Sequence, residues 1–360
     1  METNDTNRSG QSADKRQWLK KLLRYIIPLA ITVGLCWILF KDQDPVAMIR
    51  TIREKCRWEW IGLVLTLSIL SHVIRAMRWR IQLEGIGIKI GLYPVVLSIF
   101  GCYAVNLVFP RLGELWRTGY ISQRQDAPFD KVFGSMVADR LADTVTVALL
   151  TLITFVLAGP QLTEYLSQNK ETYLALKELV TSPWTWAVVG FGLLLLWALF
   201  ARAKNTRIVR KVIGFGKGLW KGFAAVATMH GRGRWLLLTA ALWGCYFMQL
   251  YFAFFAFPET AQMIERHGVI AALVCFVFSS LSMGVPSNGG IGPWQWAIIF
   301  GISFFSADIP GLTRETATTF ANLVMGTQTV LLILLGLFTF ISIAVGRQRK
   351  FHQSNTDYHA

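Results

Sequence analysis

Long stretches without a charged residue constrain this 360-residue chain more than any other feature of its sequence. Most of them are long enough, alone or with their flanks, for a membrane-spanning helix of about 20 apolar residues. They cover 25–40, 60–74, 90–110, 144–163, 179–201, 235–258, 267–307 and 316–346. With 53% hydrophobic and only 16% charged residues, the chain has too little polar surface for a water-soluble domain. The sequence therefore predicts an all-α integral membrane protein.

Two of these runs do not fit a simple crossing. The run 267–307 would measure roughly 60 Å as one helix, twice the hydrocarbon core, and Gly284-Val-Pro-Ser-Asn-Gly-Gly-Ile-Gly-Pro293 interrupts it. It is either a pair of crossings or a re-entrant hairpin, and both return the chain to the side it came from. The run 90–110 has basic flanks on both sides, which argues against a net crossing. We expect six full crossings and two re-entrant or broken helical hairpins.

The basic residues predict the orientation of the chain. In a soluble protein this chain's net charge of +15 would suggest binding to nucleic acid. In a membrane protein the basic residues instead indicate which segments face the cytoplasm, so no nucleic-acid partner is expected. The segment 202–234 carries nine Lys and Arg residues and no acid, so we place it in the cytoplasm with both termini. Cytoplasmic segments then hold 26 of the 36 basic residues, although the external loop 41–57 keeps five. The predicted parts are a basic segment 1–24, a transmembrane domain 25–346 and a cytoplasmic tail 347–360.

The tips of the two predicted hairpins resemble each other. The first reads Val108-Phe-Pro-Arg-Leu-Gly-Glu-Leu-Trp-Arg117, and the second reads Gly284-Val-Pro-Ser-Asn-Gly-Gly-Ile-Gly-Pro-Trp-Gln295. Paired hydrophobic segments interrupted by Gly and Pro indicate a binding site built from inverted repeats. A broken helix also exposes N–H groups that favour an anion, and Pro293 is well placed to begin the second half. The glycines would let a phosphate approach, while the alternative is that they only permit close packing.

Charged residues inside the apolar body are the candidate functional groups. An ionisable residue at the membrane centre costs about 2.5–3.5 kcal/mol on insertion scales, so it normally faces a bundle interior or a cavity. Mutual pairing and snorkelling to lipid are the structural alternatives, and snorkelling is the favoured interpretation for Arg78 and Arg80. The excess of arginine over carboxylate suits an anionic headgroup, because guanidinium binds phosphate through two hydrogen bonds. The candidate headgroup-binding residues are Arg75, Arg78, Arg111, Gly113, Glu114, Arg117, Asp139, Arg140, Asp143, Asn288, Gly289, Gly290 and Gln295.

Four elements in order carry a family resemblance: Arg75-Ala-Met-Arg-Trp79, Asn106-Leu-Val-Phe-Pro-Arg-Leu-Gly-Glu-Leu-Trp-Arg117, Ala138-Asp-Arg-Leu-Ala-Asp143 and Pro286-Ser-Asn-Gly-Gly-Ile-Gly292. This succession resembles the flippase-like transmembrane region of lysylphosphatidylglycerol synthases, over nearly the whole chain. The resemblance implies a multi-pass protein of the bacterial cytoplasmic (inner) membrane, or of its archaeal equivalent, that moves a modified phospholipid between leaflets.

The resemblance transfers residue by residue only to the charged motifs and the first-tip glycine: Arg111, Gly113, Glu114, Arg117, Asp139, Arg140 and Asp143. The chain departs from the family at Gln295, where many relatives have an acidic residue. Only a short basic tail follows Gly346, in place of the aminoacyl-transferase domain of the full synthases. We therefore expect a stand-alone member, and the resemblance does not imply synthase activity.

Three functions are consistent with these features. The first is a flippase or transporter of an anionic or aminoacylated lipid. The second is a membrane transferase that acts on a lipid-linked substrate, with Asp139 and Asp143 holding Mg²⁺. The third is a non-transporting membrane partner of a lipid-modifying enzyme. Membrane lipids are the expected partners; no catalytic residue, metal site or cofactor is expected, and no GxxxxGK[ST] nucleotide loop is present.

Overall fold

A computed structural model describes residues 45–160, 181–203 and 231–357, with a few isolated positions between 160 and 181. Every regular element in these residues is a helix, which confirms the predicted all-α class. The expected first crossing at 25–40 and most of the basic segment 202–234 lie outside the described residues.

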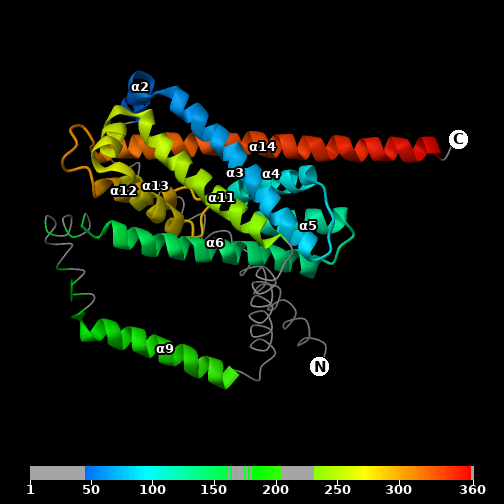
Figure 1. The fold of residues 1–360 in the computed structure, drawn as a ribbon, viewed down its shortest axis with the longest axis horizontal. Coiled ribbons are helices and arrows are strands. Elements are labelled where there is room, and N and C mark those ends of the chain that lie inside the picture. Colours follow the sequence, from blue (N-terminus) through cyan, green and yellow to red (C-terminus); the bar gives the residue numbers. More distant parts are fainter. Residues whose placement is uncertain are drawn as a thin grey trace, which may run out of the picture.

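Five helices of the described chain are long and apolar enough to cross a membrane (Figure 1). They are α3 (Trp58–Gly85), α6 (Phe129–Leu157), α11 (Arg232–Ala253) with the short 3-10 helix η1 (Phe254–Ala256), α12 (Pro258–Ser282) and the Arg314–Gly346 part of α14 (Arg314–Asp357). A further apolar helix, α9 (Pro183–Ala203), is drawn apart from the others. The run predicted at 144–163 begins earlier, at Phe129, so the charged residues from Asp139 to Asp143 lie within a long apolar helix, as expected.

Both predicted broken segments are helical hairpins. In the first, α4 (Leu92–Val108) and α5 (Leu112–Arg124) are joined by a three-residue tip. In the second, α12 is followed by an irregular tip and by α13 (Pro293–Ser303), which begins at the proline expected to open it. Although α12 as a whole has the length of a membrane span, Gly268 interrupts it at φ 64° and ψ −154°. The part that follows is only about 21 Å long, too short by itself for a hydrocarbon core of about 30 Å. This length fits a hairpin that enters and returns on one side, while the total number of crossings stays a prediction.

The two hairpins lie toward opposite ends of the bundle. The α4–α5 hairpin is on the side of the carboxyl end of α14, and the α12–α13 hairpin is on the side of α2 (Pro45–Lys55) (Figure 1). The helix α2 fills most of the loop 41–57, whose basic residues fit the charge rule poorly, and one of them, Lys55, forms an ion pair with Glu259 of α12. The arrangement agrees with hairpins that enter from opposite sides.

The tips of the two hairpins contact each other. The backbone N–H of Gly289 donates to the carbonyl of Asn106 at 3.1 Å, and the guanidinium of Arg111 donates to the carbonyl of Gly284 at 3.0 Å. Gly289 has a φ of 62°, and a Cβ atom there would lie 2.6 Å from Leu107. The similar tips are therefore neighbours in space, and the positive φ of Gly289 is a backbone conformation that favours glycine.

Two apolar clusters hold the bundle together. The larger one joins α12, α13, η1 and the start of α14, and includes Phe254 stacked on Phe320 with ring centroids 5.0 Å apart. The smaller one joins α3, α4, α5 and α6 around the fully buried Trp79. Because α3 and α6 pack against each other at this second cluster, the polar residues beside Trp79 are enclosed by the same helices.

Candidate functional site

Two arginines of α3 face two aspartates of α6. Arg78 Nη2 lies 2.6 Å from Asp139 Oδ1 and 2.7 Å from Asp143 Oδ1. Arg75 lies 2.8 Å from Asp143 Oδ2 and 3.4 Å from Asp139 Oδ2. The two arginines are three residues apart and the two aspartates are four apart, so each pair lies on one face of its helix. Each carboxylate therefore contacts both guanidinium groups.

This network is buried. The side chains of Arg78 and Asp139 are fully enclosed, and Arg75 is 4% exposed. An unpaired charge in such a place costs several kcal/mol, so mutual pairing is what allows these groups to stay inside. The interpretation that Arg78 snorkels to the lipid surface is wrong, because the carboxylates of α6 hold it in the interior. Arg80, by contrast, is 40% exposed and pairs with Glu84 at 2.9 Å.

Arg117 of α5 enters the same region with fewer partners. Its side chain is fully buried, and its nearest carboxylate oxygen, Asp139 Oδ2, is 3.5 Å away. Its guanidinium carbon lies 4.5 Å from the ring centroid of Trp79, a cation–π contact. Within the described chain none of its three nitrogen atoms makes a hydrogen bond. Arg117 is thus a buried cation whose N–H groups make no hydrogen bonds with the described residues.

The remaining charges of this region connect α5 with α6. Arg140 Nη2 lies 3.2 Å from Glu114 Oε1, and the side-chain amide of Asn106 donates to the same oxygen at 3.5 Å. Pairing between Glu114 and its neighbour Arg111 was the structural alternative, and it does not occur. Arg111 instead adopts a left-handed conformation with φ 61° before α5 and reaches the second tip.

These seven charged residues form what we call the ion cluster: Arg75, Arg78, Arg117, Arg140, Glu114, Asp139 and Asp143. Four arginines against three carboxylates leave one positive charge in excess. A buried positive excess with unused N–H groups favours a negatively charged oxygen ligand, because charge-assisted hydrogen bonds are about twice as strong as neutral ones.

The polar residues of the second tip form a separate network. The side chain of Gln295 accepts from the N–H of Gly292 at 2.6 Å and donates to Asn322 of α14 at 3.1 Å. Gln295 therefore caps the start of α13 and joins it to α14. Gly289 and Gly290 adopt positive φ values that such a tight turn requires, and Asn288 lies in the same tip. The expectation that these residues bind a headgroup stays a prediction.

Gly113 is placed by packing. Its N–H donates to the side-chain oxygen of Asn106 at 2.8 Å, and a Cβ atom there would lie 2.0 Å from the carbonyl oxygen of Cys102. Only a residue without a side chain allows α4 and α5 to approach this closely.

A substitution pair on α5 tests this packing. We expect Gly113→Ala to lower the free energy of unfolding by about 3 kcal/mol, because the clash involves backbone rather than a flexible side chain. In Gly119→Ala the new Cβ meets open space, so stability should be unchanged or rise by less than about 1 kcal/mol. Thermal unfolding of the two variants in detergent measures the difference, and equal melting temperatures would contradict it.

Several residues of the site were not predicted. Tyr246 of α11 accepts a hydrogen bond from Arg75 Nε at 3.1 Å, yet it lies in an apolar run that gives no signal. Trp79 and Asn106 stand inside the motifs that carry the family resemblance, so the motifs themselves could have suggested them. His72, which shares a face with Arg75, packs against Tyr103 with ring centroids 4.6 Å apart and an angle of 31° between the planes, instead of entering the ion cluster.

The fold and the ion cluster place the chain among multi-pass membrane proteins that keep charged groups inside a helical bundle. More specifically, it belongs to the family described as the lysylphosphatidylglycerol synthase TM region, which matches residues 25–336 and confirms the resemblance.

Two similar proteins are archaeal UPF0104 membrane proteins. The one from Methanocaldococcus jannaschii is 28% identical over 114 residues, which cover 30% of this chain and 34% of the relative. The one from Pyrococcus horikoshii is 26% identical over 146 residues, or 39% of this chain and 42% of the relative. The chain thus matches less than half the length of each relative. No solved structure matches it significantly.

Proposed function

We propose that the chain is a flippase-type transporter, which carries a polar phospholipid with an anionic or aminoacylated headgroup across the cytoplasmic membrane. The headgroup binds at the ion cluster while the acyl chains stay in the lipid. The single observation that carries this proposal is Arg117, a fully buried arginine whose nitrogen atoms have no hydrogen-bond partner in the described chain.

The ion cluster offers groups of both signs to such a headgroup. Arg117 supplies N–H donors for a phosphate, and the other three arginines are held by carboxylates. Glu114 stands one turn earlier on α5, and its Oε2 atom also lacks a hydrogen bond among the described residues. A carboxylate oxygen and a guanidinium that both lack hydrogen bonds among the described residues, three positions apart on one helix, fit an aminoacylated phospholipid, which has an ammonium group and a phosphate.

Transport requires the ion cluster to open. Arg117 and Asp139 are fully buried, so a lipid can reach them only if α5 moves relative to α3 and α6. The contacts between the two tips, from Gly289 to Asn106 and from Arg111 to Gly284, are few and local. In this proposal they break and re-form as the hairpins move, so that the cluster faces one leaflet and then the other.

The transferase hypothesis receives less support. It used Asp139 and Asp143 as ligands of Mg²⁺, and each of these carboxylates lies within ion-pair distance of three guanidinium groups. A metal ion would therefore compete with arginines that are already in place. The geometry favours binding of an anion over binding of a cation.

Reconstitution tests the proposal. The full chain is reconstituted in phosphatidylcholine vesicles that contain a trace of fluorescent lipid. A membrane-impermeant quencher then reports the fraction of the fluorescent lipid in the outer leaflet. The panel contains phosphatidylglycerol, an aminoacylated phosphatidylglycerol, phosphatidylcholine and an uncharged diacylglycerol. We expect protein-dependent movement of the first two above protein-free vesicles. Movement of none of the four, or equal movement of all four, would refute a headgroup-selective transporter.

A further inference from the structure

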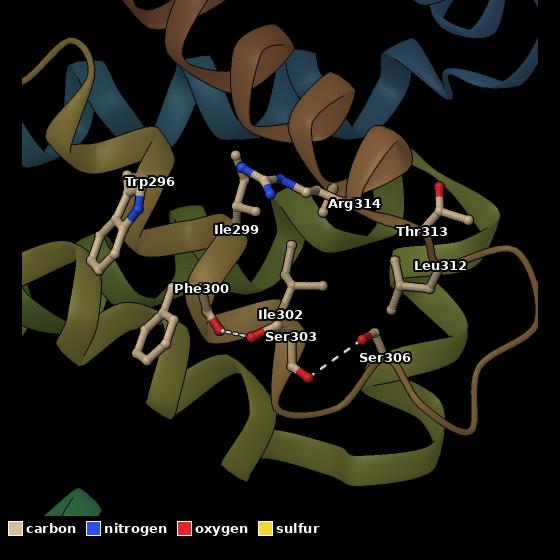
Figure 2. A pocket seen from close by; sticks show the side chains of 10 residues that line it. Trp296, Ile299, Phe300, Ile302, Ser303, Ser306, Leu312, Thr313 and Arg314 are labelled. Carbon is tan, nitrogen blue, oxygen red and sulfur yellow. Dashed lines mark hydrogen bonds between the residues drawn. The ribbon is translucent and has the colours of Figure 1, made fainter. Parts of the chain in front are cut away.

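A pocket of about 280 Å³ lies between α13 and the start of α14, away from the ion cluster (Figure 2). It is at the end of the bundle that carries the second hairpin, where α13 has turned back and the loop 304–313 leads into α14. Its lining consists of Trp296, Ile299, Phe300, Ile302, Ser303, Ser306, Leu312, Thr313, Arg314 and Ala317.

The walls of this pocket combine an aromatic surface with one cation. Trp296 stacks on Phe300, with ring centroids 5.3 Å apart and an angle of 7° between the planes. Among the ten lining residues Arg314 alone is charged, and Figure 2 shows its side chain extending from the start of α14 towards α13, which carries the two rings. Serine hydroxyls stand at the lower end, where Ser306 donates to the carbonyl of Ser303. Such a pocket suits an amphipathic anion better than a purely apolar or a purely hydrophilic ligand.

Arg314 is also free to bind a ligand. The carboxylate of the preceding loop, Asp308, is already paired with Arg266 at 2.6 Å and with His267 at 3.1 Å. Among the residues that the structure describes, no carboxylate lies within ion-pair distance of Arg314. Its guanidinium therefore keeps its donors for an anion in the pocket.

The position of Arg314 along its helix indicates the source of that anion. It is the first residue of the apolar span Arg314–Gly346, so it stands where the apolar surface of the bundle ends. Lipid phosphates lie at this level, and arginines at helix ends normally meet them there. By the orientation predicted from the basic residues, this end faces away from the cytoplasm.

We propose that this pocket binds the phosphate of a phospholipid. Arg314 holds the phosphate, and the Trp296–Phe300 wall covers the glycerol and the first part of an acyl chain. The binding of a phospholipid in this pocket does not depend on the proposed function. The further role of the pocket, as the place where the transported lipid docks at one side of the membrane, rests on that function. A free phosphate shares the anionic chemistry, but it would leave the aromatic wall without a partner.

Photo-crosslinking tests this assignment. The full chain in phosphatidylcholine vesicles is exposed to phosphatidylglycerol with a photoreactive group near the head of one acyl chain, and labelled peptides are mapped by mass spectrometry. We expect labelling of α13 around Trp296 and Phe300. Arg314→Gln should reduce it roughly fivefold, the scale of a partly exposed ion pair, while Arg314→Lys should keep most of it. Arg266→Gln, which removes an arginine of the same end that is already paired, is the matched control and should label like the wild type.

Three results would overturn the assignment. The first is labelling of α13 that does not change in Arg314→Gln, and the second is an equal loss in Arg266→Gln. The third is complete displacement of the lipid by inorganic phosphate, which would assign the pocket to a free anion. Failure here is distinct from failure of the transport proposal. If crosslinking depends on Arg314 but no lipid is transported, the lipid-binding pocket stands and the transport proposal is refuted. If lipid is transported but crosslinking does not depend on Arg314, transport stands and the pocket assignment is refuted.

Discussion

Replacing Asp139 with alanine is expected to remove most of the folded protein from detergent extracts. The carboxylate is fully buried and balances three arginines, at 2.6 Å from Arg78, 3.4 Å from Arg75 and 3.5 Å from Arg117. Without it the ion cluster holds four arginines against two carboxylates. Breaking a buried ion pair by deleting one partner costs about 3–5 kcal/mol, because the other charge stays buried without compensation. That is a large part of the stability of an ordinary domain.

A second substitution separates this electrostatic cause from a simple loss of volume. Adding Arg78→Met to Asp139→Ala restores the balance of charge and replaces the guanidinium by an apolar side chain. The double variant should then be more stable than the sum of the two single changes predicts, with a coupling energy of at least about 1–2 kcal/mol. Asp130→Ala, in the exposed first turn of the same helix, is the matched control and should cost less than about 1 kcal/mol. Heating in detergent followed by size-exclusion chromatography measures the wild type, the two single variants, the double variant and the control. A wild-type melting temperature for Asp139→Ala, or strict additivity in the double variant, would contradict the interpretation.

Local sequence chemistry predicted the helices of this bundle but not all of their limits. Long apolar runs and clustered Gly and Pro are local signals, so the broken hairpins and the start of α13 at Pro293 could be read directly. The apolar run that begins at 267 placed a boundary close to Gly268, but the segment before it was expected to be a loop and is instead the first part of α12. Contact between the two tips could not be predicted either, since it depends on how two distant hairpins pack.

The site shows the same division between local and tertiary information. The spacing of Arg75 and Arg78 and of Asp139 and Asp143 predicted that each pair shares a helix face. Which faces meet is decided by packing of α3 on α6, for example at Trp79, whose indole N–H donates to Ser135 at 3.1 Å. Without that contact, snorkelling was the reasonable interpretation for Arg78. On the sequence the expected partner of Arg140 is Asp143, three residues later, whereas the structure places Glu114 of α5 nearer, at 3.2 Å against 3.8 Å.

Arg117, the arginine to which the proposed transport assigns the headgroup, is the charge of the ion cluster that the fold needs least. Arg75 and Arg78 each hold two carboxylates, so removing either would leave buried negative charge. Arg117 has only a 3.5 Å contact with Asp139 and makes no hydrogen bond among the described residues. Arg117→Gln would bring the ion cluster to zero net charge. We therefore expect a change in stability of less than about 1 kcal/mol, because the lost contact with Trp79 is offset by relief from burying an unsatisfied cation.

Transport of phosphatidylglycerol by Arg117→Gln should nevertheless fall on the order of 100-fold. Hydrogen bonds to a charged group contribute about 1.5–3 kcal/mol each, and a phosphate held by two of them loses both in this variant. Arg80→Gln is the matched control, because Arg80 lies on α3, is partly exposed and pairs with Glu84. The transport rate of this variant should stay near that of the wild type. A folded Arg117→Gln protein that moves lipid at the wild-type rate would show that the headgroup does not bind at this arginine. An equal loss in both variants would attribute the effect to general surface charge instead of the ion cluster.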